Sequence, residues 1–208
     1  MPPCHGGDRE FKSRPDRHVR NQRNIEFLFF YIQNTESRFS METMTKFEKV
    51  SYAQYFNSLK DICDEATIKA SYDAIKLPKR ATKRSAGYDF FAPLSFTLQP
   101  NETIKIATGI RVSIAGNYFL GIFPRSGLGF KYRLQLDNTV GIIDADYYDS
   151  DNEGHIFIKL TNDTNANKTV TINQGEGFAQ GIFIPFGLTD DDQVTNTRNG
   201  GLGSTTQQ

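Results

Sequence analysis

One stretch of the chain carries apolar residues at helical spacing. Ser51, with Gln54 three positions later, has the form of a capping box, which marks a helix start. We therefore predict a short N-terminal helix, with Cys63 on its buried face as a small hydrophobic residue, because neither a histidine nor a CxxC partner lies nearby. The apolar positions, separated by steps of three and four, are Tyr52, Tyr55, Phe56, Leu59, Ile62 and Cys63.

From Leu77 onward the apolar positions instead alternate with polar ones, as they do in strands. Turn residues such as 99–102, 115–117 and 162–165 separate the short strands. This punctuation predicts an all-β, antiparallel sandwich or barrel rather than alternating βαβ units. The alternating sets are Ile104 and Ile106; Ile110, Val112 and Ile114; Leu134 and Leu136; Ile156, Ile158 and Leu160; Val170 and Ile172; and Ile182 or Phe183 with Ile184.

Residues 1–43 show neither pattern, since several arginines precede a single apolar run at 27–32. We treat them as an extension outside the core: a disordered tail, a targeting segment or an artefact of an upstream start. The predicted domain spans 44–208, with 195–208 as a C-terminal arm. The apolar run has six residues where a membrane span needs about 20, so we expect no membrane crossing.

Composition narrows the function classes further. Lys plus Arg equals Asp plus Glu at 24 each, so no overall charge is present to hold a nucleic acid through many phosphate contacts. Two cysteines are too few for a disulfide framework, and no secretory signal opens the chain. We expect an intracellular, cytoplasmic protein with a local anion site.

Three polar clusters follow or interrupt the strands. Residues 124–129 (PRSGLG) combine arginine, serine and glycines whose backbone N–H groups can approach a phosphate. Residues 144–153 hold five carboxylates, yet an EF-hand calcium loop starting at Asp149 would place Leu160 where a bidentate Glu is required. Residues 198–206 are glycine-rich and stop two residues before the terminus, where no helix can follow, so we expect neither a Walker loop nor a dinucleotide loop.

In this order the clusters resemble the five motifs of the trimeric dUTP pyrophosphatase (dUTPase) family over about 130 residues, from Leu77 to Thr206. The similar segments are Ser85–Asp89, Pro124–Leu128, Gly141–Tyr147, Gly175–Gln180 and Arg198–Thr206. The resemblance implies a jelly-roll-like β-barrel of the dUTPase type with a flexible C-terminal arm. It also implies a homotrimer whose active sites lie between subunits and which hydrolyses dUTP to dUMP and pyrophosphate, limiting uracil in DNA and supplying dUMP for dTMP synthesis.

The resemblance also implies residue roles. Asp144 is the expected general base, because an aspartate carboxylate is ionised at neutral pH. Asp89 is expected to hold, through water, a Mg²⁺ ion that arrives with the triphosphate. Tyr147 is expected to pack on the deoxyribose and exclude a ribose 2′-hydroxyl. The expected substrate contacts are Arg125, Ser126, Gly127 and Gln180 for phosphates; Asn138, Ile142, Ile143 and Phe157 around uracil; and Arg198, Leu202, Gly203, Ser204 and Thr205 in the arm.

This sequence also departs from the family pattern. Leu202 stands where an aromatic usually stacks on uracil, so we expect weaker nucleotide binding with intact chemistry. Residues 148–153 lengthen the third motif before Gly154. Arg84 replaces a frequent glycine, and Gly177 a frequent arginine. His155, beside the acidic loop, is expected at the surface with no role.

Two alternatives stay open. A dCTP deaminase would share the barrel, but that family lacks the glycine motif at 198–206. A nucleotide-gated regulatory protein would use dUTP to order its arm and the 148–153 loop to engage a protein partner. Substantial nucleotide binding with negligible turnover would favour it over the enzyme.

Overall fold

The structure is a computed structural model, and it describes residues 45–195 and Arg198. The chain divides into two units, 1–42 and 43–208, and all described residues belong to the second. The expected boundary after residue 43 stays a prediction. The strands are β1 (Lys46–Lys49), β2 (Lys79–Arg80), β3 (Tyr88–Phe91), β4 (Phe96–Leu98), β5 (Thr103–Ala107), β6 (Ile110–Ser113), β7 (Tyr118–Pro124), β8 (Leu134–Leu136), β9 (Gly141–Ile143), β10 (Phe157–Asn162), β11 (Val170–Ile172) and β12 (Gly177–Pro185).

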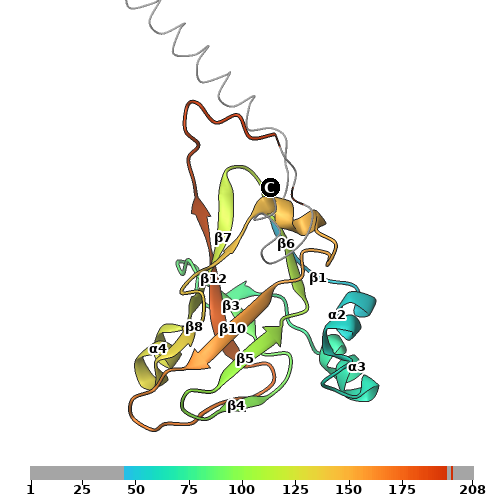
Figure 1. Cartoon of the computed structure of the whole chain (residues 1–208), viewed down its shortest axis with the longest axis vertical. Helices are drawn as coiled ribbons and strands as arrows, with labels where there is room; N and C mark the ends of the chain where they lie inside the picture. The colour runs from blue at the N-terminus through green and yellow to red at the C-terminus, as the bar shows by residue number, and fades with distance from the viewer. Residues whose placement is uncertain (1–44, 196–197, 199–208) are drawn as a thin grey trace, which may run out of the picture. The chain divides into compact units, whose positions relative to one another are not determined.

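These strands form a layered antiparallel fold, as the alternating pattern predicts (Figure 1). The larger sheet has the order β2-β3-β12-β7-β9, and a three-stranded sheet has the order β5-β10-β8. Two further pairs, β1-β6 and β11-β4, complete the described strands. The core contains the inward side chains of both larger sheets, including Leu120, Ile122, Phe178, Ile158 and Leu160. Among the described residues no helix is long and apolar enough to cross a membrane.

The helix predicted from Tyr52 exists but is shorter than expected. Helix α2 spans Tyr52–Leu59, and Ser51 Oγ accepts a hydrogen bond from the Gln54 backbone N–H at 3.1 Å. The chain leaves the helix at Lys60 and tightens into a turn in which Ile62 N–H bonds Leu59 O at 2.9 Å. This turn directs Ile62 to solvent, 73% exposed, whereas Cys63 packs partly buried against the core. The prediction that Ile62 lies on the buried face of the helix was therefore wrong.

Two further helices were not predicted. Helix α3 (Glu65–Asp73) begins at the N-cap Asp64, which accepts a hydrogen bond from Thr67 N–H at 2.9 Å. It packs beside α2 (Figure 1). Helix α4 (Ser126–Tyr132) begins inside the segment 124–129, which was interpreted as a glycine-rich phosphate turn, and extends beyond it. A short 3₁₀ helix, η1 (Ala145–Asp149), follows β9.

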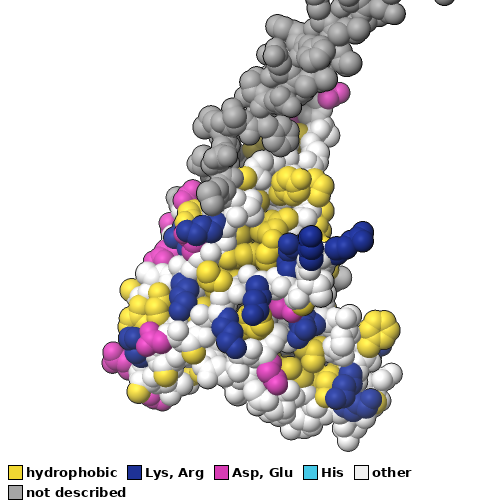
Figure 2. Space-filling model, turned by 180° about the vertical axis from the view of Figure 1, so that it is seen from behind, with side chains coloured by type: hydrophobic (Ala, Val, Ile, Leu, Met, Phe, Trp, Pro, Cys, Tyr) yellow, Lys and Arg dark blue, Asp and Glu magenta, His cyan; other side chains and the backbone are white. Residues whose placement is uncertain are grey.

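The outer face of the five-stranded sheet is apolar. Gly121 in β7 pairs with Ile182 of β12 and Ile142 of β9, so these residues share a face. A Cβ on Gly121 would meet Phe123 at 2.8 Å and Ile184 at 3.1 Å, which places those two side chains on the same face. Ile142 is 60% exposed. Figure 2 shows hydrophobic side chains gathered on one side of the molecule with lysine and arginine side chains beside them.

Candidate functional site

The first cluster of predicted site residues meets on three neighbouring strands. Gln180, on the central strand β12, lies opposite Asp89 of β3 on one side and Phe123 of β7 on the other. Arg125 follows the end of β7. The register of the sheet therefore brings together residues from the first, second and fourth expected motifs, which lie between 36 and 91 positions apart in sequence.

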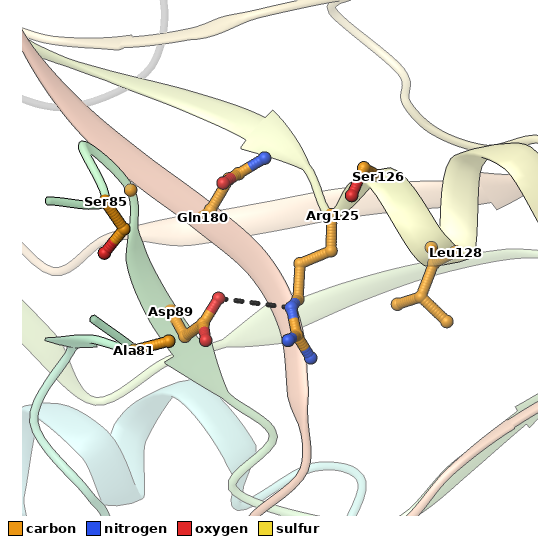
Figure 3. A pocket seen from close by; sticks show the side chains of 9 residues that line it. Ala81, Ser85, Asp89, Arg125, Ser126, Leu128 and Gln180 are labelled. Atoms are coloured by element: carbon orange, nitrogen blue, oxygen red, sulfur yellow. Dashed lines mark ion pairs between the residues drawn. The ribbon is translucent and has the colours of Figure 1, made fainter.

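Arg125 spans this cleft. Its Nε lies 3.1 Å from Asp89 Oδ1, and its Nη1 donates a hydrogen bond to Gly177 O at 2.9 Å. Gln180 Nε2 donates to Pro124 O at 3.0 Å, which holds the amide beside the arginine. Figure 3 shows Arg125 and Asp89 pointing toward one another across the cleft, with Ser126 and Gln180 nearby. The cleft has a volume of about 350 Å³ and is lined by Ala81, Ser85, Gly87, Asp89, Arg125, Ser126, Gly127, Leu128 and Gln180.

Glycines keep the cleft open at specific points. A Cβ on Gly177 would lie 2.6 Å from Arg125 Nη1, so the glycine in place of the usual arginine makes room for the Arg125 guanidinium. A Cβ on Gly87 would lie 2.4 Å from Gln180 Oε1. A Cβ on Gly127 would meet nothing within 4 Å, because that residue borders open space. The backbone beside Ser126 is thus accessible to an anion from the cleft.

The second cluster lies at the end of β9. Asp144 follows Ile143 directly and begins η1. Arg198 Nη2 lies 3.2 Å from Asp144 Oδ2, and Nη1 lies 3.6 Å from Asp146 Oδ1. The guanidinium carbon is 5.7 Å from the ring centroid of Tyr147. An arginine of the C-terminal arm therefore reaches the expected general base of its own chain.

Tyr147 is buried, with 8% of its surface exposed. Its hydroxyl donates to His155 O at 2.8 Å and accepts a hydrogen bond from Asn152 Nδ2 at 2.8 Å. Burial raises the pKa of this phenol above its ordinary value, which the Asn152 hydrogen bond and Arg198 partly oppose. The ring is a neutral, fixed surface.

The longer loop at 148–153 is bound to the N-terminal part of the domain. The Tyr148 hydroxyl donates a hydrogen bond to Glu48. The Arg111 guanidinium lies over the Tyr148 ring, with its Cζ 3.5 Å from the ring centroid. Glu153 accepts hydrogen bonds from the Ser51 backbone N–H at 2.7 Å and from Ser51 Oγ at 2.6 Å. The side chain of Glu153 thus takes the place expected for Gln54 in the capping box. The protein partner expected at this loop stays a prediction.

The surface position expected for His155 was wrong, because the residue is fully buried. Its Nε2 accepts a hydrogen bond from Gly109 N–H at 2.9 Å, and its Nδ1 lies 3.3 Å from Ser58 Oγ. The left-handed backbone of Gly154, with φ of +66°, turns the chain inward at this point. Burial lowers the pKa of His155 to about 4; Lys105 acts in the same direction and Glu153 opposes it.

The residues expected around uracil do not form one cluster within the chain. Asn138 is exposed in the turn between β8 and β9, and Ile142 lies on the outer face of the sheet. Ile143 points the other way and packs against the core. Phe157 packs on His155, with ring centroids 4.4 Å apart, and is covered by Lys105 Nζ at 4.5 Å from its centroid. The predicted arm residues Leu202, Gly203, Ser204 and Thr205 lie outside the described residues.

Reasoning from the sequence missed Asn152, which contacts the Tyr147 hydroxyl. The signal available was its position inside the insert that separates Tyr147 from Gly154. No periodicity marks such a contact, since it depends on how the loop folds back. The described residues contain no group of three or more His, Cys, Asp or Glu side chains placed to hold a metal ion.

Comparison with known proteins identifies the family of this chain. A family model described as dUTPase matches residues 73–206. The deoxyuridine 5′-triphosphate nucleotidohydrolase of Lactococcus lactis is 40% identical over 144 residues, covering 68% of this chain and 95% of that protein. The corresponding protein of Haemophilus influenzae (strain PittEE) is 39% identical over 140 residues, covering 64% of this chain and 88% of that protein.

Solved structures show the same fold. The dUTPase of Streptococcus mutans is 34% identical, with a TM-score of 0.52, over 69% of this chain and 98% of that one. The dUTPase of phage phi11 of Staphylococcus aureus, 24% identical, matches with a TM-score of 0.51 over 74% of this chain and 97% of that one. The all-β, jelly-roll-like barrel is therefore confirmed. With its family model, relatives and fold in agreement, the chain belongs to the dUTPase family of nucleotide-hydrolysing enzymes.

Proposed function

We propose that this protein hydrolyses dUTP to dUMP and pyrophosphate. Asp144 accepts a proton from a water molecule whose oxygen forms the new bond to phosphorus, while the bond between the α- and β-phosphates breaks and pyrophosphate leaves. Arg125, Ser126 and Gln180 bind phosphate oxygens, because they converge on one cleft with an arginine at its centre. Membership of the dUTPase family and this convergence support the proposal together.

Tyr147 presents its ring to the deoxyribose and excludes a ribose 2′-hydroxyl. Asn138 and the backbone of Ile142 and Ile143 read the uracil edge, with Phe157 as an additional wall. Arg198 and the following arm residues, Leu202 to Thr205, close over the phosphates. The contacts of Arg198 with Asp144 and Tyr147 support a closing role for the arm.

The cleft residues fit Mg²⁺ held through water. Asp89 offers one carboxylate to the cleft, and Mg²⁺ typically binds through one or two carboxylates while keeping waters and substrate phosphates as its other ligands. When bound, the ion supplies positive charge that offsets the charge of the phosphate chain. Asp89 would hold the ion through water, and Arg125 orients the Asp89 carboxylate through their ion pair.

The proposal that two subunits share each site rests on the distance between the two clusters within one chain. Ile143 pairs with Leu120 at one end of β7, whereas Arg125 follows the other end. At about 3.3 Å per residue and 4.8 Å between strands, Asp144 and Arg125 of one chain lie about 20 Å apart. Groups acting on one phosphate chain must lie within hydrogen-bond reach of it. We infer that Asp144 of one subunit works with Arg125 of another.

The apolar outer face of the five-stranded sheet supports such an assembly. Phe119, Phe123, Ile182 and Ile184 line the face between the two clusters and are only partly buried in one chain, and Ile142 on the same face is 60% exposed. Burying them against further copies is favoured by the hydrophobic effect. A homotrimer would complete three sites at once.

A subunit-mixing experiment tests the function and the shared site together. Asp144→Asn and Arg125→Ala proteins are each expected to be nearly inactive toward dUTP with Mg²⁺. After unfolding and refolding as an equal mixture, about a quarter of the sites combine an intact Asp144 with an intact Arg125 from a neighbour, so about a quarter of wild-type activity returns. Each variant refolded alone is the control.

The outcomes are distinct. Wild-type protein without pyrophosphate release from dUTP would refute the proposed reaction, and faster turnover of dCTP, dTTP or UTP would refute the substrate. An active wild type whose mixed variants stay inactive would refute the shared site alone. A chelator should abolish turnover, and added Mg²⁺ should restore it.

A further inference from the structure

The insert that lengthens the third motif has a direct contact with the candidate sugar platform. Asn152 Nδ2 donates to the Tyr147 hydroxyl oxygen at 2.8 Å. The same hydroxyl donates its proton to His155 O at 2.8 Å, so its oxygen must act as the acceptor toward Asn152. The two hydrogen bonds fix the outer end of the ring from two sides.

The loop that carries Asn152 is held in place at the two positions that follow this residue. Glu153 binds the N-cap of α2 through Ser51 N–H at 2.7 Å and Ser51 Oγ at 2.6 Å. Gly154 follows with φ of +66°, and a Cβ there would lie 2.8 Å from Tyr147 O and from Tyr148 Cα. Asn152 therefore has little freedom to follow the ring if the ring moves.

Within the described part of the chain, the amide of Asn152 makes no other hydrogen bond that would explain its place. Its Oδ1 is buried and has no partner among the described residues. Buried polar atoms of this kind carry a cost in folding free energy unless a neighbouring contact offsets it. The hydrogen bond to Tyr147 is the contact that the amide makes.

We propose that Asn152 is a positioning residue that sets sugar selectivity by holding the Tyr147 ring against the deoxyribose. This inference rests on the proposed function, in which Tyr147 excludes the ribose 2′-hydroxyl. Without the amide, the phenol keeps one hydrogen bond and gains space into which the ring can tilt. A tilted ring leaves room for the 2′-hydroxyl, so UTP is rejected less strongly.

The test compares dUTP with UTP in matched variants. Asn152→Asp keeps the shape of the side chain but removes the N–H donor, and Asn152→Ala removes the side chain. Asn165, exposed in a distant loop, provides the control Asn165→Ala. We expect both Asn152 variants to lower the ratio of kcat/KM for dUTP to that for UTP by about three- to tenfold, the value of one hydrogen bond. The control should keep the wild-type ratio.

A double-mutant cycle separates positioning from general loosening of the loop. Tyr147→Phe removes the acceptor, so adding Asn152→Ala to it should change the ratio no further. An equal loss of selectivity in the Tyr147→Phe background, or unchanged ratios in both Asn152 variants, would overturn the inference. A lower Tm with an unchanged ratio would show that Asn152 serves folding alone.

Binding measurements keep the two proposals distinguishable. Calorimetric affinities for dUTP and UTP, measured with Asp144→Asn to prevent turnover, should show the same loss of discrimination in the Asn152 variants. A wild type that binds dUTP without hydrolysing it refutes the proposed reaction, while the affinity ratio still decides the role of Asn152. A wild type that neither binds nor hydrolyses dUTP refutes both.

Discussion

The buried imidazole of His155 should make the protein lose stability in mildly acidic solution. Its pKa is about 4 in the folded chain, below the ordinary value of 6.5. As pH falls below 6.5, the unfolded chain takes up a proton here while the folded chain does not. Stability is therefore complete above pH 6.5 and falls as pH drops toward 4. Between pH 7 and pH 5 the loss from this one group is about 2 kcal/mol.

The variant His155→Gln isolates this contribution. Glutamine can still accept a hydrogen bond from Gly109 N–H, and it does not titrate. Its poorer packing on Phe157 lowers stability by the same amount at every pH, so only the slope against pH reports the imidazole. The assay is urea unfolding of both proteins at pH 7, 6 and 5, at one fixed protein concentration because the proposed assembly would contribute to stability.

The difference between the two curves removes the carboxylates and the other histidines, which are common to both proteins. We expect wild type to lose about 2 kcal/mol more than His155→Gln between pH 7 and pH 5. Parallel curves would refute the reasoning. An NMR titration midpoint for His155 near its ordinary value would refute it independently.

Three further outcomes are expected. Gly154→Ala should lower the free energy of unfolding by about 2–4 kcal/mol, because of its positive φ and the backbone of Tyr147 and Tyr148 that a Cβ would strike; urea unfolding measures this. Asp144→Asn should lower kcat for dUTP by about 10²- to 10⁴-fold with a smaller change in KM, as steady-state kinetics would show. The hydrogen bonds from Ser51 lower the pKa of Glu153 in the folded chain, so the ionised carboxylate stabilises the fold above its unfolded-state pKa. This contribution is lost as pH falls through the folded-state pKa. In urea unfolding at acidic pH, Glu153→Gln should therefore show a smaller dependence of stability on pH than wild type.

The sequence was most informative where local pattern and packing coincide. The alternation at Ile104 and Ile106, or at Leu134 and Leu136, predicts strands because each apolar residue of a half-buried strand points to the core. The Ser51 cap likewise depends on a contact three residues away. The segment 126–132 was harder, because its two glycines indicate a turn although the chain forms a short helix there.

The sequence motifs name residues of the candidate cleft, but they do not show that these residues lie together. Asp89, Arg125 and Gln180 could be named from motifs, yet their meeting depends on the register of β12 between β3 and β7, which no local pattern specifies. His155 was misplaced for a related reason. Its polar neighbours in sequence indicate a surface loop, but the turn at Gly154 and the N–H of Gly109 draw it inside.

The attachment of the insert to Ser51 and Glu48 also has an evolutionary consequence. Both of these residues precede the part of the chain that the family model matches, whereas the insert lies within it. In related chains that lack the insert, Glu48 has no tyrosine partner and Ser51 serves only as the cap of the helix, whereas chains that acquire the insert gain both contacts. Relatives should therefore have either all or none of the residues equivalent to Glu48, Ser51, Tyr148 and Glu153, although two of these lie outside the residues that the family model matches.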